Sequence, residues 1–400
     1  MPNTDNTDVV IASMARTPIG NFQGAYAGVA ATQLGSNAIS ASLSRAGIEP
    51  DSDAIDEVMM GCVLPAGLGQ APARQAALGA GISQGTGCIT LNKVCGSGMK
   101  TVMLARDSIA AGTNKVVVAG GMESMTRAPH ILPSGRAGLR FGHGQVLDHM
   151  AFDGLEDAYQ SGTAMGVFAE KCAREWQFSR EEQDAYSVRS VERAQAAIRD
   201  GNFADEIIPV EVKSRKGTVT VSDDEKPGLV NAEKIAQLRP AFEKDGTVTA
   251  GNASAISDGA AAMVLMGAQE AERRSISPIA RIVGHTTHAQ APEWFTTAPV
   301  ASIKNLVEKV GWKLSDVDLF EINEAFAVVP MAAMRELDLP AEKVNIHGGA
   351  IALGHPIGAS GARIMVTLLN ALKQTGGTKG IASLCIGGGE ATSIAVELIS

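Results

Sequence analysis

The sequence predicts an α/β fold with largely parallel or mixed sheets. Short apolar runs alternate with stretches of helical periodicity near the start of the chain and again from about residue 278. The composition is 45% hydrophobic and 19% charged with 44 glycines, which suits large buried cores and tight strand–helix turns. The 400 residues exceed one typical core, so we expect two or three domains.

The first third predicts one alternating series of strands and helices. A β-rich run at 9–13 stops before the Arg-Thr-Pro-Ile-Gly breaker at 16–20. Residues 32–46 have helical periodicity and stop at Gly47. A strand follows at 57–62 and a helix at 98–111. A strand at 115–119 should then end at Gly120 and Gly121.

The middle of the chain, 125–251, differs in character. It contains loops such as 133–138, a helix at 180–200 rich in Glu, Arg and Gln, and charged turns at 214–228. We interpret it as an insertion into the main core.

The last third returns to alternation, with a strand at 319–322, a helix at 359–372 and a strand at 380–385. It also contains a weak repeat of the first half. In both halves a Ser-Gly pair, at 97–98 and at 360–361, opens a helix that precedes a strand ending in glycines. Two such units are often similar by chance, so the repeat favours a duplication without establishing it.

Charge and cysteine content exclude several classes of protein. A net charge of −9 argues against a nucleic-acid partner, which requires a basic face. Five cysteines without a Cys-x-x-Cys pair argue against a disulfide framework and favour a reducing cytosol. Residues 1–8 resemble neither a signal nor a transit peptide, and no apolar run approaches the roughly 18 residues of a membrane span. We therefore expect a cytoplasmic protein without a membrane partner.

Cys95 is the first candidate for chemistry. A lone cytosolic cysteine is usually a small buried hydrophobe. Here Gly96-Ser97-Gly98 and a helix follow directly, and the positive end of a helix dipole would stabilise a thiolate. Cys62, Cys88 and Cys172 lack this setting and are assigned structural roles.

His355 is the second candidate, because glycines flank it and Pro356 restricts the backbone. Such a setting suits a side chain held in one orientation to accept a thiol proton. His285 and His288 have an H-x-x-H spacing without an apparent third ligand, so we expect no metal site there.

Cys385 and Asn323 each end a predicted strand. Cys385 precedes three glycines at the carboxyl edge of a sheet, where α/β sites gather, and N–H groups of Gly387–Gly389 could stabilise an oxyanion. It could equally be a buried residue before a turn. Asn323 could form a turn or hold a water by its amide, and alone it decides nothing.

Taken together, four segments resemble the motifs of the thiolase family, and more closely its acetyl-CoA acetyltransferase branch. They are Val-Cys-Gly-Ser-Gly at 94–98, Asn-Glu-Ala-Phe at 323–326, Gly-His-Pro-Ile-Gly at 354–358 and Cys-Ile-Gly-Gly-Gly at 385–389. Gly-Asn-Ala-Ser at 251–254 resembles the segment that contacts the pantetheine arm of coenzyme A. The resemblance covers nearly the whole chain.

The resemblance implies two similar βαβαβαββ halves packed in five α–β–α–β–α layers, with a loop domain inserted in the first half. The first half would comprise 1–124 and 253–277, the loop domain 125–252, and the second half 278–400. The loop domain would bind coenzyme A and, through a hairpin within 134–159, make the contacts of a homotetramer.

The resemblance also implies roles. Cys95 would carry the acyl group, His355 would activate Cys95 and share an oxyanion hole with a water held by Asn323, and Cys385 would move the proton at the α-carbon. The N–H groups of Cys95 and Gly387 would form a second hole. Coenzyme A thioesters would be substrates, so no resident cofactor is expected. Their binding residues would be Met165, Lys226, Ala250, Ala253, Ser254, Ala325 and Phe326.

The implied reaction is 2 acetyl-CoA ⇌ acetoacetyl-CoA + CoA. Two alternatives remain: a broad 3-ketoacyl-CoA thiolase of fatty-acid degradation, and a catalytically silent acyl-CoA or lipid-binding protein. Ala164 stands where acetoacetyl-CoA thiolases usually have His, which favours the broad enzyme. Glu390-Ala391 replaces the usual sequence after the glycines, and Lys226 stands near an expected arginine. Retention of both cysteines, His355 and Asn323 argues against the silent protein.

Overall fold

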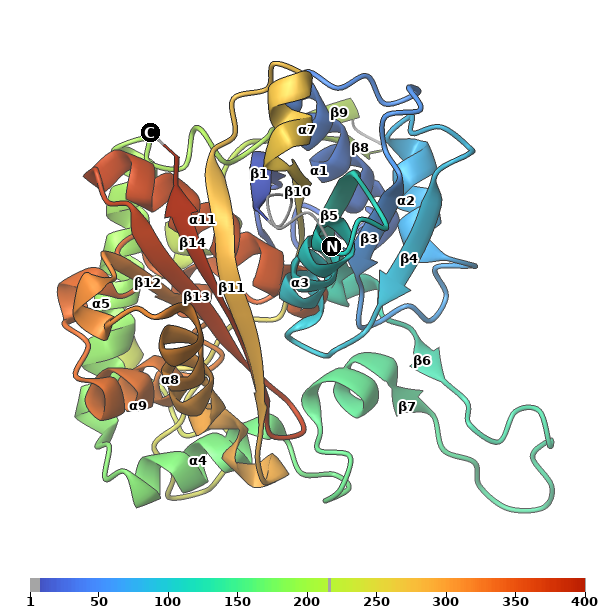
Figure 1. The fold of residues 1–400 in the computed structure, drawn as a ribbon. Coiled ribbons are helices and arrows are strands. Elements are labelled where there is room, and N and C mark those ends of the chain that lie inside the picture. The colour runs from blue at the N-terminus through green and yellow to red at the C-terminus, as the bar shows by residue number, and fades with distance from the viewer. Residues whose placement is uncertain (1–7, 215–216, 400) are drawn as a thin grey trace.

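The computed structural model describes residues 8–214 and 217–399, and in them one mixed sheet of ten strands forms the centre (Figure 1). The strand order is β12-β13-β14-β11-β1-β10-β5-β3-β4, with β2 paired to β10. The strands are β1 Val9–Arg16, β2 Gly20–Asn21, β3 Glu57–Gly61, β4 Gly87–Leu91, β5 Val116–Ser124, β10 Ser257–Gly267, β11 Ala280–Ala289, β12 Leu319–Ile322, β13 Lys379–Ile386 and β14 Glu390–Leu398.

The sheet consists of two halves with the same connectivity. In the first half β3 is parallel to β5, and β10 and β1 follow as antiparallel neighbours. In the second half β12 is parallel to β13, and β14 and β11 follow in the same way. An antiparallel contact between β1 and β11 joins the halves. The two similar halves are confirmed, and the weak repeat in the sequence marks equivalent helices, α3 and α11.

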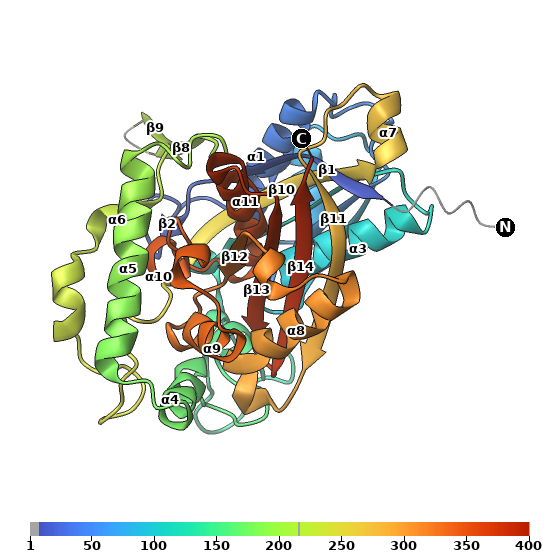
Figure 2. The same cartoon turned by 60° about the vertical axis from the view of Figure 1, so that its left-hand side comes forward.

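The two halves of the sheet and three layers of helices together form five layers. Helices α1 (Ala31–Ala46) and α2 (Pro72–Gly79) pack on the outer face of the first half. Helices α8 (Ala298–Val310) and α9 (Val328–Leu337) cover the outer face of the second. Between the halves, α3 (Ser97–Ala110) and α11 (Ile357–Thr375) share one apolar cluster with strands of both (Figure 2). The α–β–α–β–α arrangement is confirmed.

The two central helices approach closely where each begins. A Cβ atom on Gly98 would lie 2.9 Å from the backbone nitrogen of Ala362, and one on Gly361 would lie 2.4 Å from that of Met99. Only glycine fits such an approach of two backbones. Because Cys95 precedes α3 and His355 precedes α11, this contact brings the two candidate residues to the same place.

The predicted end of β5 was wrong. The strand continues through Gly120 and Gly121 to Ser124. A Cβ atom on Gly120 would lie 2.1 Å from the carbonyl oxygen of Ala261, and one on Gly121 would lie 2.1 Å from that of Gly358. These glycines therefore admit neighbouring backbones and do not end the strand. The first strand likewise extends beyond 9–13 to Arg16, whose buried guanidinium pairs with Glu206 and Asp224 at 2.6 and 2.8 Å.

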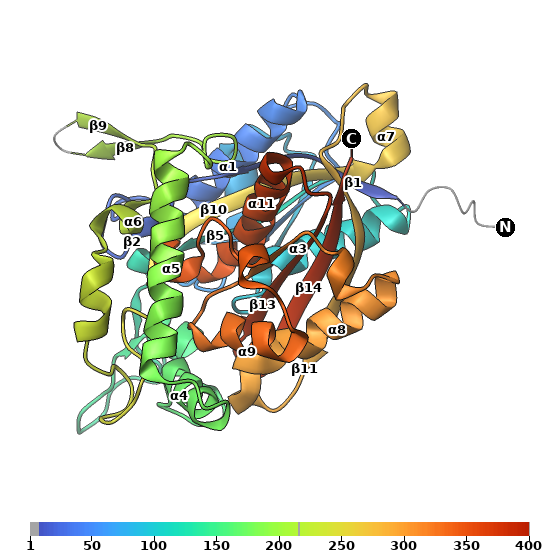
Figure 3. The same ribbon diagram turned by 90° about the vertical axis from the view of Figure 1, so that its left-hand side faces the viewer.

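Between β5 and β10 the chain leaves the sheet and forms α4 (Met165–Glu175), α5 (Arg180–Arg199) and α6 (Glu225–Leu229). The helix predicted at 180–200 is confirmed as α5, which begins with a capping box of Ser179 and Glu182. The turns predicted at 214–228 were wrong in part. There β9 (Gly217–Val221) pairs with β8 (Val210–Ser214) and α6 follows (Figure 3). Residues 215–216 lie outside the described residues, and the domain boundaries at 125–252 stay a prediction.

A long exposed segment, 132–146, extends from the hairpin of β6 (His130–Ile131) and β7 (Leu147–Asp148); we call it the arm (Figure 1). Its exposed apolar side chains are Leu132, Leu139, Phe141 and Val146. In the part of the chain that the structure describes, no helix is long and apolar enough to cross a membrane.

Candidate active site

A cavity of about 730 Å³ lies at the meeting point of α3, α11 and the inserted region. Ten of the twelve predicted site residues line it. They are Cys95, Met165, Lys226, Ala250, Ala253, Ser254, Ala325, Phe326, His355 and Gly387. The other two, Asn323 and Cys385, are fully buried beside it. Four distant segments of the chain thus reach one site.

Cys95 lies on a tight turn ahead of α3. The turn holds Val94 at a positive φ of 46° and is braced by a hydrogen bond of 2.8 Å from the Val94 N–H to Oδ1 of Asn92. Burial raises the pKa of the Cys95 thiol to about 11, although the N–H groups of Gly387 and of Cys95 itself oppose the rise. The nearby dipoles do favour the thiolate, as expected, but burial outweighs them and keeps the pKa of the thiol above its usual value.

The same two N–H groups point at the Cys95 sulfur, and they are the pair predicted to form an oxyanion hole. An oxygen that develops charge on a carbon attached to this sulfur would lie within their reach.

The His355 ring is held in one tautomer. Its Nδ1 lies 2.6 Å from Oγ of Ser360, and this hydroxyl donates its one proton to the carbonyl of Pro356 at 3.0 Å. With that hydroxyl donating to Pro356, Nδ1 carries the proton and donates it to Oγ, and the lone pair of Nε2 faces Nδ2 of Asn323. Burial, together with the positive charge of Arg363, lowers the pKa of His355 to about 3. The ring is a neutral acceptor that can take a thiol proton.

Asn323 faces this histidine, with its Nδ2 3.4 Å from Nε2 of His355. Its buried Oδ1 has no hydrogen-bond partner among residues 8–214 and 217–399. A buried acceptor without a partner suits a bound water, the role that the sequence suggested for this amide.

Glu324 fixes the segment that carries Asn323. Its carboxylate accepts hydrogen bonds from the Tyr186 hydroxyl at 2.9 Å and the Ser190 hydroxyl at 2.7 Å, both on α5. It also accepts from Nδ2 of Asn345 at 3.0 Å. The inserted region therefore positions a residue of the second half.

Cys385 lies near the end of β13 with its thiol fully buried. Burial and the neighbouring Cys95 hold the pKa of this thiol well above its usual value. Both thiols are therefore protonated before a substrate binds.

The wall of the cavity is formed by two paired segments. The Ser254 N–H donates to the carbonyl of Ala325 at 2.9 Å, and Ala253 pairs with Phe326. Phe242 and Phe295 complete this apolar wall. No motif in the sequence surrounds either ring, so neither was predicted as part of the site.

Lys226 and Glu390 lie at the two places where the sequence departs from the resembled motifs. The Lys226 ammonium contacts the carbonyl of Ile351, and burial lowers the pKa of Lys226 to about 8. Lys226 is the one cationic side chain that lines the described cavity, and no carboxylate lines it. Glu390 forms an ion pair with Lys93, two residues before Cys95.

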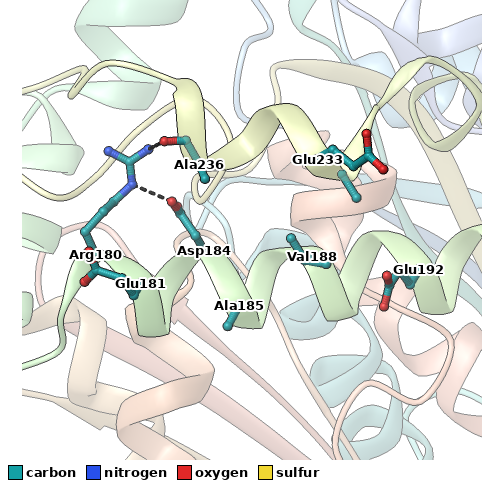
Figure 4. A pocket seen from close by; sticks show the side chains of 9 residues that line it. Arg180, Glu181, Asp184, Ala185, Val188, Glu192, Glu233 and Ala236 are labelled. Atoms are coloured by element: carbon teal, nitrogen blue, oxygen red, sulfur yellow. Dashed lines mark hydrogen bonds and ion pairs between the residues drawn. The ribbon is translucent and has the colours of Figure 1, made fainter.

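A second hollow of about 450 Å³ lies between α5 and the short helix η3 (Ala232–Gln237) (Figure 4). Four acidic side chains line it, Glu181, Asp184, Glu192 and Glu233, and Arg180 pairs with Asp184 at 2.6 Å. None of the predicted site residues lines it, so the chemistry belongs to the larger cavity.

Two family models match nearly all of this chain. The thiolase N-terminal domain matches residues 9–269, and the thiolase C-terminal domain matches residues 276–398. The chain belongs to the thiolase family.

Individual thiolases agree with this assignment over their full length. The chain is 51% identical over 396 residues to acetyl-CoA acetyltransferase 1 of Arabidopsis thaliana, covering 98% of this chain and 95% of that protein. It is 50% identical over 394 residues to acetyl-CoA acetyltransferase of Rhizobium meliloti, with 98% and 99% covered.

Solved structures agree as well. The crystal structure of the Bacillus anthracis acetyl-CoA acetyltransferase superposes with a TM-score of 0.96 at 42% identity, over 99% of this chain and 100% of that one. The Acat5 thiolase from Ascaris suum in complex with coenzyme A superposes with a TM-score of 0.92 at 40% identity, over 98% and 100%.

Proposed function

We propose that this thiolase is an acetyl-CoA acetyltransferase that catalyses 2 acetyl-CoA ⇌ acetoacetyl-CoA + CoA. The observation that carries the proposal is the convergence of two thiols, a neutral histidine and two N–H groups at one cavity. The full-length relatives named acetyl-CoA acetyltransferase support the same substrate.

In the first half-reaction the Cys95 sulfur attacks the carbonyl carbon of acetyl-CoA while its proton moves to Nε2 of His355. The carbonyl oxygen becomes an oxyanion that the N–H groups of Cys95 and Gly387 would hold. The C–S bond to coenzyme A then breaks, and the departing thiolate takes the proton of Cys385. Acetyl-Cys95, the Cys385 thiolate and protonated His355 remain.

In the second half-reaction the Cys385 thiolate removes a proton from the methyl carbon of another acetyl-CoA. The resulting enolate oxygen would be held by His355 and by a water on Asn323. The enolate carbon attacks the carbonyl of acetyl-Cys95, and the C–S bond to Cys95 breaks. The Cys95 sulfur recovers its proton from His355, so both thiols end as they began.

Coenzyme A would extend along the wall formed by Met165, Ala250, Ala253, Ser254, Ala325 and Phe326, with Lys226 as a cationic contact. We also propose that no metal or resident cofactor takes part, because N–H groups, a histidine and a water supply the oxyanion contacts. Dialysis against a chelator should then leave turnover unchanged.

The acyl chain length of the preferred substrate distinguishes this proposal from a broad 3-ketoacyl-CoA thiolase. Ala164, which precedes α4, lines the cavity where a larger side chain would narrow it. Thiolysis rates should be measured for 3-ketoacyl-CoA substrates of increasing length. A peak at acetoacetyl-CoA supports the proposal, equal or greater kcat/KM for long chains supports the broad enzyme, and no turnover supports a silent binding protein.

We also propose a cytoplasmic homotetramer. The exposed apolar arm supports the assembly, and a mouse relative named acetyl-CoA acetyltransferase, cytosolic, at 50% identity supports the location. Fractionation of the cells that make the protein would test the location.

A further inference from the structure

Glu123 is a buried carboxylate that the proposed chemistry does not use. It lies one residue before the end of β5 and is fully inaccessible to solvent. One oxygen accepts hydrogen bonds from the N–H groups of Val63 and Gly358, both at 2.9 Å. The other accepts from the Leu64 N–H at 3.2 Å. The Cys62 thiol donates to this second oxygen as well, at 3.7 Å. Among the described residues no basic side chain pairs with Glu123, so backbone N–H groups and one thiol compensate its charge.

The donors belong to two segments that are distant in the sequence, 62–64 and the start of α11. Gly358 lies in the first turn of α11, three residues after His355. Val63 and Leu64 belong to an apolar cluster that packs against Cys95. The carboxylate therefore joins the segment that carries the base to the segment behind the nucleophile.

The fit around Gly358 is close. A Cβ atom there would lie 2.6 Å from Oε2 of Glu123 and 3.0 Å from Cα of Cys62. A shift of the first turn of α11 would lose this hydrogen bond and move His355, because Pro356 and Ile357 connect the two rigidly.

We propose that Glu123 is a positioning residue, whose carboxylate holds the first turn of α11, and with it His355, in register with Cys95. The inference rests on the proposed function, in which His355 takes the Cys95 proton. The sequence alone does not reveal it, because a glutamate at the end of an apolar strand has no motif of its own.

A purely electrostatic role makes the opposite prediction. The negative charge of Glu123 opposes formation of the Cys95 thiolate. Neutralising the charge would therefore make Cys95 more reactive if charge alone mattered. If position matters, the same substitution makes Cys95 less reactive, because His355 no longer meets the thiol correctly.

Two variants separate these roles. Glu123→Gln removes the charge and turns one acceptor into a donor that faces N–H groups. Glu123→Asp keeps the charge but is one methylene too short to span the segments. The rate at which iodoacetamide alkylates Cys95 is followed by mass spectrometry of its peptide, at a pH well above the Glu123 pKa, which burial raises to about 7. We expect both variants to slow alkylation by about 10- to 100-fold, as misplacement of a catalytic group typically does.

Steady-state kinetics supply the second readout. Both variants should lower kcat by a similar factor while KM for acetyl-CoA stays within about twofold, because Glu123 does not line the cavity. Faster alkylation in Glu123→Gln with wild-type rates in Glu123→Asp would overturn the proposal in favour of electrostatics.

Glu170→Gln is the matched control. Glu170 is equally buried and likewise accepts from backbone N–H groups, those of Thr247 and Val248 at 2.9 and 2.7 Å. It should lower the melting temperature without changing the alkylation rate. Equal slowing in this control would show a general loss of stability and overturn the positioning role. Iodoacetamide requires no thioester, so the result stands apart from any failure of the proposed reaction.

Discussion

At the scale of single residues, the two thiols and the histidine of the site are neutral at rest. Burial raises the pKa values of Cys95 and Cys385 and lowers that of His355, so none of these three groups buries a charge before a substrate arrives. Charge appears only during the reaction, where N–H groups already lie in position.

The two thiols should respond differently to substitution. Cys95→Ser replaces the thiol by a much weaker nucleophile and should abolish acetylation by acetyl-CoA. Cys385→Ala should still acetylate Cys95, yet lose exchange of the methyl protons of acetyl-CoA with solvent, lowering condensation by at least about 10²- to 10⁴-fold. Mass spectrometry after brief incubation reads the acetyl group. Acetylated Cys95→Ser with unacetylated Cys385→Ala would reverse the two roles.

Lys226 should make KM for acetyl-CoA depend on pH. Its pKa is lowered to about 8, so the ammonium loses its proton and charge as the pH rises from 7 to 9. A cationic contact with the anionic coenzyme would then weaken. KM should rise by about 5- to 10-fold, because the loss of a hydrogen bond worth about 1.5–3 kcal/mol is limited by the roughly tenfold fall in the protonated fraction over this pH range.

Two variants of Lys226 serve as controls. Lys226→Arg remains charged and should keep a low KM throughout this range, whereas Lys226→Met should have a high KM that does not change with pH. A wild-type KM that is constant from pH 7 to 9 would remove Lys226 from the binding residues.

The sequence indicated the candidate residues that meet at the cavity, but not those that hold them in place. Cys95, His355, Cys385 and Asn323 lie in segments of recognisable composition. Glu123 and the rings of Phe242 and Phe295 act through contacts that arise only when distant segments pack together. No local pattern distinguishes such residues from ordinary core residues.

At the scale of elements, the contact between α3 and α11 determines the site. The sequence indicated both helices and missed the reason for several glycines. The pattern predicted the end of a strand at Gly120 and Gly121, whereas these glycines leave room for the backbones of β10 and α11 to approach closely. A local pattern shows that a side chain is absent, but not which backbone fills the space.

Gly361→Ala should separate the two helices. Its Cβ would lie 2.4 Å from the backbone nitrogen of Met99, which cannot yield as a side chain could. Overpacking of this kind costs about 1–3 kcal/mol of unfolding free energy. We expect a lower melting temperature and slower alkylation of Cys95. Gly28→Ala, where a new Cβ meets nothing within 4 Å, should match the wild type; an equal effect at both glycines would contradict this account.

At the scale of the whole molecule, the arm is the feature that a single chain does not explain. All of 132–146 is exposed, including the Phe141 ring. An exposed apolar segment that extends from the body usually marks an interface, and closed symmetric assembly is common among such enzymes.

The arm should hold two dimers together. We expect light scattering of the wild type at micromolar concentration to give the mass of a tetramer, and the double variant Leu139→Ser/Phe141→Ser to give that of a dimer. Val219→Ser, at an apolar residue exposed on β9, should remain a tetramer. A stable wild-type dimer would exclude the proposed assembly.

The position of β1 has a consequence for how the chain folds. This strand, which precedes all other strands of the sheet in the chain, lies at the seam of the sheet, between β10 and β11. Its strand partners follow more than 240 residues later, so both edges of β1 stay unpaired until most of the polypeptide has left the ribosome. Such non-local pairing slows folding and exposes a strand edge to aggregation. The nascent chain should therefore depend on chaperones until residue 289 has emerged.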